Sequence, residues 1–202
     1  GTVETLRVFR EKLIGMDPRD IEGINAVMNR AVAYAGTAKA AVDIACHDIL
    51  GKAAGLPLYK LLGGLSNTIE TDMTVGIDTP ELMAAAAKEH VAAGFRVIKT
   101  KVGTNIADDI ARVKAIREAV GEDVKIRLDA NQGWHAREAV ELLKRLNEYD
   151  IELVEQPVRR FDFEGLKYVT ANSPVPVMAD ESCWDSKDAL RLVSERAVDF
   201  IN

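Results

Sequence analysis

The sequence is poor in cysteine and histidine, and it lacks any long apolar run. Only two cysteines, Cys46 and Cys183, occur in 202 residues, which is too few for a disulfide framework and favours a reducing, cytoplasmic setting. No cluster of histidine and cysteine of the kind that binds zinc is present. No apolar stretch approaches the length of a membrane span, and no basic-then-apolar leader opens the chain. We therefore expect no membrane partner.

The sequence also lacks a run of lysine and arginine, and its formal net charge is −6. Nucleic acids attract basic patches, so we expect no nucleic-acid partner. The content of 48% hydrophobic and 29% charged residues is ordinary for a globular protein, and the length allows one or two domains. The chain begins at Gly1 rather than Met and stops at Asn202 inside an apolar run. From these ends we expect a chain truncated at both ends relative to a longer protein.

The hydrophobic pattern changes near residue 65. Before it, apolar residues recur at helical spacing, which predicts a helical segment with helices over residues 3–13, 21–28 and 37–49. After it, short apolar strands alternate with helices, which is typical of parallel βαβ units. The predicted strands are 71–77, 96–102, 124–128, 151–154, 176–179 and 198–201, with helices over 80–93, 106–120, 136–147, 161–170 and 187–193.

This alternation predicts an α/β fold in the second part of the chain. At least five strand–helix repeats occur, and no Gly-rich dinucleotide-binding turn is present. We therefore expect a partial TIM-type (β/α) barrel, containing strands one to about six, rather than a doubly wound sheet. The predicted domains are residues 1–65, a helical N-terminal domain, and residues 66–202, the N-terminal portion of the barrel.

Residues 95–103 form a largely apolar stretch that contains two lysines. Its composition predicts a buried strand, and because strand side chains alternate, Lys99 and Lys101 share one face while Thr100 takes the other. Two neighbouring ammonium groups each suppress the other's protonation, and a lysine with a lowered pKa can act as a general base near neutral pH. By itself, however, the stretch is more typical of an edge strand with two solvated lysines, a common device against aggregation.

Three acidic residues, Asp129, Glu155 and Asp180, follow the ends of three consecutive predicted strands. They are 26 and 25 residues apart, about one βα repeat each, so a barrel places all three on one rim. Hard oxygen ligands of this kind suit Mg²⁺ or Mn²⁺. Alone, Asp129 or Asp180 would be interpreted as a helix N-cap and Glu155 as a loop residue. Three acids in register, with Lys101 at the end of the preceding strand, favour a metal site instead.

Four motifs follow one another along the chain: Lys99-Thr100-Lys101, Asp129-Ala130-Asn131-Gln132-Gly133-Trp134, Val154-Glu155-Gln156-Pro157 and Met178-Ala179-Asp180-Glu181-Ser182. In this order they resemble the enolase superfamily, muconate-lactonizing-enzyme subgroup. Residues 41–52 and 61–64 resemble the α+β capping domain of that subgroup, of which residues 1–65 would be the helical part. Within the subgroup, residues 151–158 are most similar to dipeptide epimerases of the L-Ala-D/L-Glu type.

The resemblance implies a role for each of five residues. Asp129, Glu155 and Asp180 would bind Mg²⁺, with Mn²⁺ as an alternative. Lys101 would be the base on one face of the substrate, with Lys99 as its catalytic neighbour. A lysine base that works beside Mg²⁺ on an enediolate is the known pattern of this superfamily. The implied reaction is abstraction of the proton α to a carboxylate of a small substrate, most similar to dipeptide epimerisation by a homo-oligomeric, cytoplasmic isomerase.

The resemblance also implies a secondary site and a missing partner. Asn131 and Glu181 would lie close to the metal as a secondary site. The second acid/base of the subgroup, a lysine at the end of the sixth strand, would lie about two residues beyond Asn202, so these 202 residues alone would be inactive. The alternatives are a muconate cycloisomerase, an o-succinylbenzoate synthase or N-acylamino acid racemase, and a non-catalytic fragment that retains the metal site.

Overall fold

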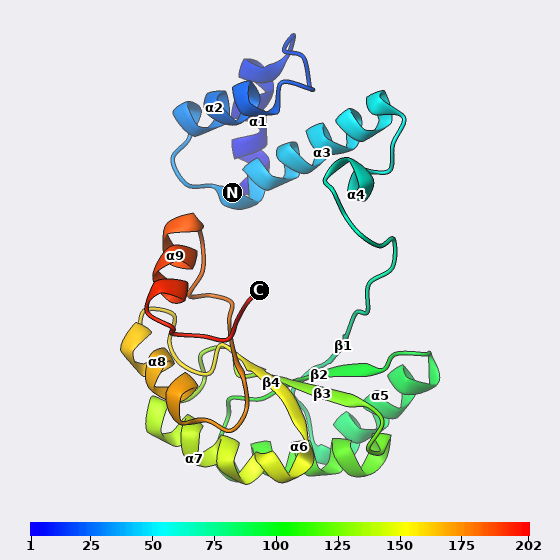
Figure 1. Cartoon of the computed structure of the whole chain (residues 1–202), viewed down its shortest axis with the longest axis vertical. Helices are drawn as coiled ribbons and strands as arrows, with labels where there is room; N and C mark the ends of the chain where they lie inside the picture. Colours follow the sequence, from blue (N-terminus) through cyan, green and yellow to red (C-terminus); the bar gives the residue numbers. More distant parts are fainter. The chain divides into compact units, whose positions relative to one another are not determined.

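The computed structural model describes residues 1–202, which divide into two compact units, Gly1–Ile69 and Glu70–Asn202 (Figure 1). The sequence predicts this division between residues 65 and 66, a few residues earlier. Each unit has its own cluster of buried apolar side chains. None of the helices is both long enough and apolar enough to cross a membrane.

The first unit is helical, as the periodicity predicts. Its small core contains Phe9, Met28 and Cys46, which come from three different helices. The second helix begins where the Asp20 carboxylate accepts a hydrogen bond from the N–H of Gly23, which satisfies one of the free donors at a helix N-terminus. The helices are α1 (Thr2–Leu13), α2 (Ile21–Ala31), α3 (Gly36–Ala54) and α4 (Leu58–Leu61).

The second unit contains one sheet of six parallel strands. The strands pair in the order of the chain, each with the next, from β1 to β6. This sequential order is that of a (β/α) barrel, whereas a doubly wound sheet reverses direction at a switch point, so the predicted barrel portion is confirmed. The strands are β1 (Met73–Val75), β2 (Val97–Lys101), β3 (Lys125–Asp129), β4 (Ile151–Glu155), β5 (Val177–Ala179) and β6 (Phe200–Ile201).

A helix follows each of the first five strands. Helices α5 to α8 lie along the same, outer side of the sheet (Figure 1). Between helices and sheet, Ile98, Ile126 and Leu128 from the strands pack with Leu142 and Leu143 from a helix, and all five are fully buried. The helices are α5 (Pro80–Ala92), α6 (Ile106–Val120), α7 (Ala136–Leu146) with the short 3₁₀ helix η1 (Asn147–Tyr149), α8 (Phe163–Asn172) and α9 (Ser186–Ser194).

The strand that carries the two lysines is not an edge strand. β2 pairs with β1 on one side and with β3 on the other, so the interpretation of Lys99 and Lys101 as solvated edge lysines is wrong. Thr100, between them, is fully buried beside Ile98 on the helix-covered face. The predicted alternation of the two lysines and Thr100 across the strand is therefore confirmed.

Thr100 gives a test of this packing. Its hydroxyl is buried without a hydrogen-bond partner, and such a group costs about 1–3 kcal/mol. Valine has nearly the same shape and favours strands. We expect Thr100→Val to raise the free energy of unfolding, measured by urea denaturation, by about 1 kcal/mol.

Thr170→Val is the matched control. The Thr170 hydroxyl contacts the carbonyl oxygens of Leu166 at 3.1 Å and Ala197 at 2.7 Å. Its removal should lower the free energy of unfolding by about 1 kcal/mol. An equal loss in the two variants would mean that the Thr100 hydroxyl is satisfied and would contradict the structure.

Candidate active site

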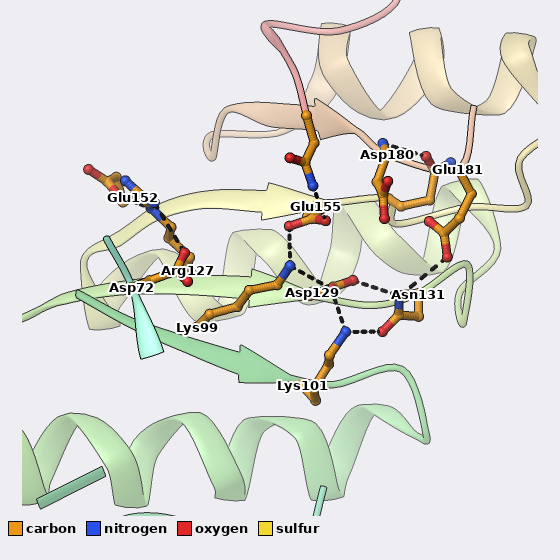
Figure 2. A network of polar contacts seen from close by, with 12 residues as sticks. Asp72, Lys99, Lys101, Arg127, Asp129, Asn131, Glu152, Glu155, Asp180 and Glu181 are labelled. Atoms are coloured by element: carbon orange, nitrogen blue, oxygen red, sulfur yellow. Dashed lines mark hydrogen bonds and ion pairs between the residues drawn. The ribbon is translucent and has the colours of Figure 1, made fainter. Parts of the chain in front are cut away.

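The predicted site residues lie at the carboxyl ends of neighbouring strands. In the β2–β3 register Lys101 lies opposite Asp129, and in the β3–β4 register Asp129 lies opposite Glu155. Asp180 directly follows the end of β5. Figure 2 shows these side chains converging from four adjacent strand ends. Parallel strands in register thus bring together residues that are about one βα repeat apart in the sequence.

None of the three acids is a helix N-cap. The caps of α7, α8 and α9 are His135, Asp162 and Asp185, each several residues further along the chain. Asp129 and Glu155 are the last residues of their strands and are almost fully buried, with exposures of 1% and 4%. The capping interpretation is therefore wrong for Asp129 and Asp180, and the buried carboxylates need another explanation.

Lys99 joins two of the carboxylates. Its Nζ lies 2.6 Å from Oε2 of Glu155 and 2.9 Å from Oδ2 of Asp129. The lysine side chain is only 17% exposed, so this is a partly buried ion pair shared between β2, β3 and β4. The ammonium group of Lys99 thus lies between two of the predicted metal ligands.

Lys101 connects the carboxylates to the secondary residues. Its Nζ lies 2.7 Å from Oδ2 of Asp129 and donates to Oδ1 of Asn131 at 2.6 Å. The amide nitrogen of Asn131 donates in turn to Oε1 of Glu181 at 3.3 Å. The structure therefore gathers Lys101, Asn131 and Glu181 in one chain of contacts beside Asp129 (Figure 2).

The pKa values of the cluster follow from burial and charge. Burial alone would lower the pKa of Lys99, but its hydrogen bonds to Glu155 and Asp129 raise it above the ordinary lysine value. The predicted mutual lowering is therefore wrong for Lys99, because the two carboxylates outweigh the neighbouring lysine. Burial would raise the pKa of Asp129, but hydrogen bonds from Lys101 and Lys99 hold it below its usual value.

The other two acids shift in the opposite direction. Burial raises the pKa of Glu155 despite its contact with Lys99, and the charge of Asp129 adds to the rise. The pKa of Asp180 is raised by burial and by the negative charges of Glu181 and Asp129. The groups around Asp180 therefore carry an excess of negative charge.

This excess fits a divalent cation. Four carboxylates, those of Asp129, Glu155, Asp180 and Glu181, face the two ammonium groups of Lys99 and Lys101, which leaves two negative charges without a partner. One oxygen of Glu181 is buried with no hydrogen-bond partner. In this structure no three of these carboxylates converge closely enough to hold a metal ion, and Lys99 lies between two of them. The oxygen-only donor set and its charge suit Mg²⁺.

Asp109 fixes the loop that follows Lys101. Its carboxylate is fully buried and accepts hydrogen bonds from the backbone of Gly103 and Thr104, from Arg112 and from the indole N–H of Trp134. Gly103 and Gly133 approach so closely that a Cβ on Gly133 would lie 2.5 Å from the carbonyl oxygen of Gly103. The loop that follows Lys101 and the loop that contains Asn131 are thereby held together.

Sequence reasoning missed three polar residues of this site. Asn202 donates to Oε1 of Glu155 at 3.1 Å, and Gln132 donates to Glu181 at 3.2 Å. Gln156, which follows Glu155, is fully buried and bonded to the loop of Asp180. Gln132 and Gln156 lie inside the quoted motifs, three residues and one residue after the ends of β3 and β4, so their place on the same rim was the available signal.

Comparison with known families covers both units. Residues 82–202 match the family described as Enolase C-terminal domain-like. Residues 3–63 match the N-terminal domain of the mandelate racemase / muconate lactonizing enzyme family. The two matches together span the helical unit and the barrel strands that carry the site.

Individual relatives are similar along the whole chain. A hydrophobic dipeptide epimerase of Enterococcus faecalis is 56% identical over all 202 residues, which cover 57% of that protein. An L-Ala-D/L-Glu epimerase of Clostridium acetobutylicum is 47% identical over 96% of this chain and 55% of its own. The crystal structure of the E. faecalis epimerase with Mg and the dipeptide L-Leu-L-Tyr superposes with a TM-score of 0.97 over 100% of this chain and 57% of that one. The chain thus spans somewhat more than half the length of these relatives.

The Asp109 contacts give a test of the loop that supports Lys101. Asp109→Asn replaces one acceptor oxygen by an NH₂ group that faces donors, and hydrogen bonds to a charged group are worth about 1.5–3 kcal/mol each. We expect the free energy of unfolding, measured in urea, to fall by about 3 kcal/mol.

Asp108→Asn serves as the control, since Asp108 is exposed and precedes Asp109 on the same helix. It should change stability by only a few tenths of a kcal/mol, roughly the value of an exposed charge in a first helical turn. Similar losses in the two variants would exclude a special role for the buried carboxylate.

Proposed function

We propose, since this chain belongs to the muconate-lactonizing-enzyme subgroup of the enolase superfamily, that the protein is a Mg²⁺-dependent dipeptide epimerase. The observation that carries the proposal is the row of Lys101, Asp129 and Glu155 across three strand ends, with an excess of negative charge beside it. The relatives with 56% and 47% identity, which are dipeptide epimerases, support it.

Asp129, Glu155 and Asp180 are the proposed holders of Mg²⁺. Asp129 and Glu155 are the last residues of β3 and β4, and Asp180 directly follows β5. Oxygen ligands of this kind also accept Mn²⁺. When bound, a divalent cation supplies positive charge that offsets the second negative charge which develops on the substrate carboxylate as the α proton leaves. The ammonium of Lys99 is shared by Asp129 and Glu155: it helps to lower the pKa of Asp129 and opposes the burial that raises the pKa of Glu155.

Lys101 is the proposed base on one face of the substrate. As a neutral amine it accepts the α proton, and the ammonium that results is stabilised by Asp129 and Asn131, both of which already contact Nζ. Both lysines project from β2, so they serve the same side of the site. Inversion needs a second acid/base on the opposite face, and we place it, as the resemblance implies, at the end of the sixth strand just beyond Asn202.

Two dipeptide classes are candidate substrates. The sequence of residues 151–158, which resembles epimerases of the L-Ala-D/L-Glu type, favours L-Ala-L-Glu. The relative at 56% identity, in contrast, is a hydrophobic dipeptide epimerase whose structure contains L-Leu-L-Tyr. With the full-length protein and Mg²⁺ in D₂O, we expect ¹H NMR to show loss of the α-proton signal and appearance of the second epimer for at least one of the two dipeptides. Removal of the metal with EDTA should stop the reaction and added Mg²⁺ should restore it. Exchange that persists in EDTA, or its absence with both dipeptides, would refute the proposal.

The base assignment has its own test. Lys101→Met in the full-length protein should lower the rate of epimerisation in both directions by about 10³-fold or more, the size of a general-base contribution. Lys125→Met is the control. Lys125 begins β3, at the end of that strand opposite Asp129, and pairs with exposed Glu70. That variant should retain the rate of the unaltered protein. A Lys101→Met enzyme that epimerises at an unchanged rate would remove Lys101 from the mechanism.

A further inference from the structure

We infer that Gln156 is a positioning residue that fixes the main chain of Asp180 and thereby sets the affinity of the protein for the divalent cation. The inference rests on the proposed function, because it takes Asp180 as a metal ligand. Neither the sequence motifs nor the comparisons give Gln156 this role.

Asp180 depends on its main chain for its position. The ion pairs of Lys99 and Lys101 hold Asp129 and Glu155, and neither lysine forms an ion pair with Asp180. β5 ends at Ala179, so Asp180 is the first residue outside the strand. Its backbone N–H donates to Oε1 of Gln156 at 3.0 Å. A side chain from the neighbouring strand end therefore replaces the strand ladder at this residue.

The hydrogen-bonding groups of Gln156 are all used. Oε1 accepts a second hydrogen bond, from the N–H of Ser182 at 3.1 Å, so one oxygen holds residues on both sides of Glu181. Nε2 donates to the Ser182 hydroxyl at 2.8 Å and to the carbonyl oxygen of Val158 at 2.9 Å. The backbone N–H donates to Met178 O at 2.9 Å, and the carbonyl oxygen accepts from Gln132 N at 2.8 Å. A buried amide with every partner in place specifies one geometry for the groups around it.

The backbone of Gln156 supports a positioning role. Its φ is +38°, a left-handed conformation that costs a non-glycine residue about 1–3 kcal/mol. Gln156 is nevertheless fully buried and follows Glu155 directly. The turn at Gln156 directs its side chain across to β5, which ties the loop after β4 to the loop after β5. The same turn thus serves two proposed metal ligands, one adjacent in sequence and one held through space.

The hydrogen bonds around Gln156 extend to the loop after β3. The Ser182 hydroxyl donates to the carbonyl oxygen of Arg160, and the N–H of Arg160 donates to Oε1 of Gln132. Gln132 donates to Glu181 from its amide nitrogen. The loops after β3, β4 and β5 are therefore joined by side-chain amides and a hydroxyl, with Gln156 making the only direct side-chain contact to the main chain of Asp180.

The test measures metal binding rather than catalysis. Free Mn²⁺ is counted by electron paramagnetic resonance during titration of the full-length protein, and Mg²⁺ binding is measured by calorimetry. Gln156→Met keeps the size of the side chain and removes its four hydrogen bonds. We expect the Mn²⁺ dissociation constant to rise by about 10- to 100-fold, the range for loss of a residue that orients a ligand.

Ser173→Ala is the matched control. Ser173 bonds through its hydroxyl to Val175 O and Val175 N, at the opposite end of the segment that contains β5. It should lower the free energy of unfolding and leave the Mn²⁺ dissociation constant unchanged. If Gln156→Met fails to fold, Ser182→Ala removes one anchor of the Gln156 amide and keeps the bond to Asp180. It should raise the dissociation constant about threefold, the order of one neutral hydrogen bond.

The outcomes separate this inference from the proposed function. Mn²⁺ binding by the unaltered protein together with an unchanged constant in Gln156→Met or Ser182→Ala overturns the inference alone. An equal weakening in Ser173→Ala also overturns it, because binding would then follow general stability. Failure of the unaltered protein to bind either Mn²⁺ or Mg²⁺ overturns the proposed function and this inference with it.

Discussion

The site depends on one interaction, the sharing of the Lys99 ammonium between Asp129 and Glu155. Two carboxylates that are almost fully buried at adjacent strand ends repel each other and lose their hydration, so they need positive charge within contact distance. The lysine supplies one such charge from the neighbouring strand. Because Asp180 and Glu181 add negative charge without further cations, the same constraint favours a divalent metal ion at this rim.

Hydrogen bonds to buried polar side chains hold the loops around this charge cluster. Asp109 accepts hydrogen bonds from the loop after β2 and from the indole of Trp134, and Gln156 accepts hydrogen bonds from the loop after β5. Asn131 and Gln132, like Gln156, have positive φ values, of 40° and 70°. Such backbone strain persists only where surrounding contacts determine it, and these three residues follow the strands that carry two of the proposed ligands.

Much of the fold could be predicted from the pattern of the sequence. All six strands occur within a few residues of their predicted positions, because short apolar runs between turn residues have few other arrangements in an α/β chain. The prediction about lysine acidity fails for Lys99, since the pattern shows its neighbour Lys101 but not the carboxylates that contact it across the sheet. Gln156 was overlooked for a similar reason: its partners Asp180 and Ser182 are more than twenty residues away.

The sequence by itself determined the order of the strands, the residue types at their ends and the repeat that separates them. These follow from local periodicity and from the fixed length of a βα unit. Only the tertiary structure decided which ammonium meets which carboxylate, which acids are left without a cation and which amide holds Asp180. These pairings depend on side-chain geometry across neighbouring strands, where a shift of about an ångström changes the hydrogen-bond partner. A local sequence pattern does not contain that geometry.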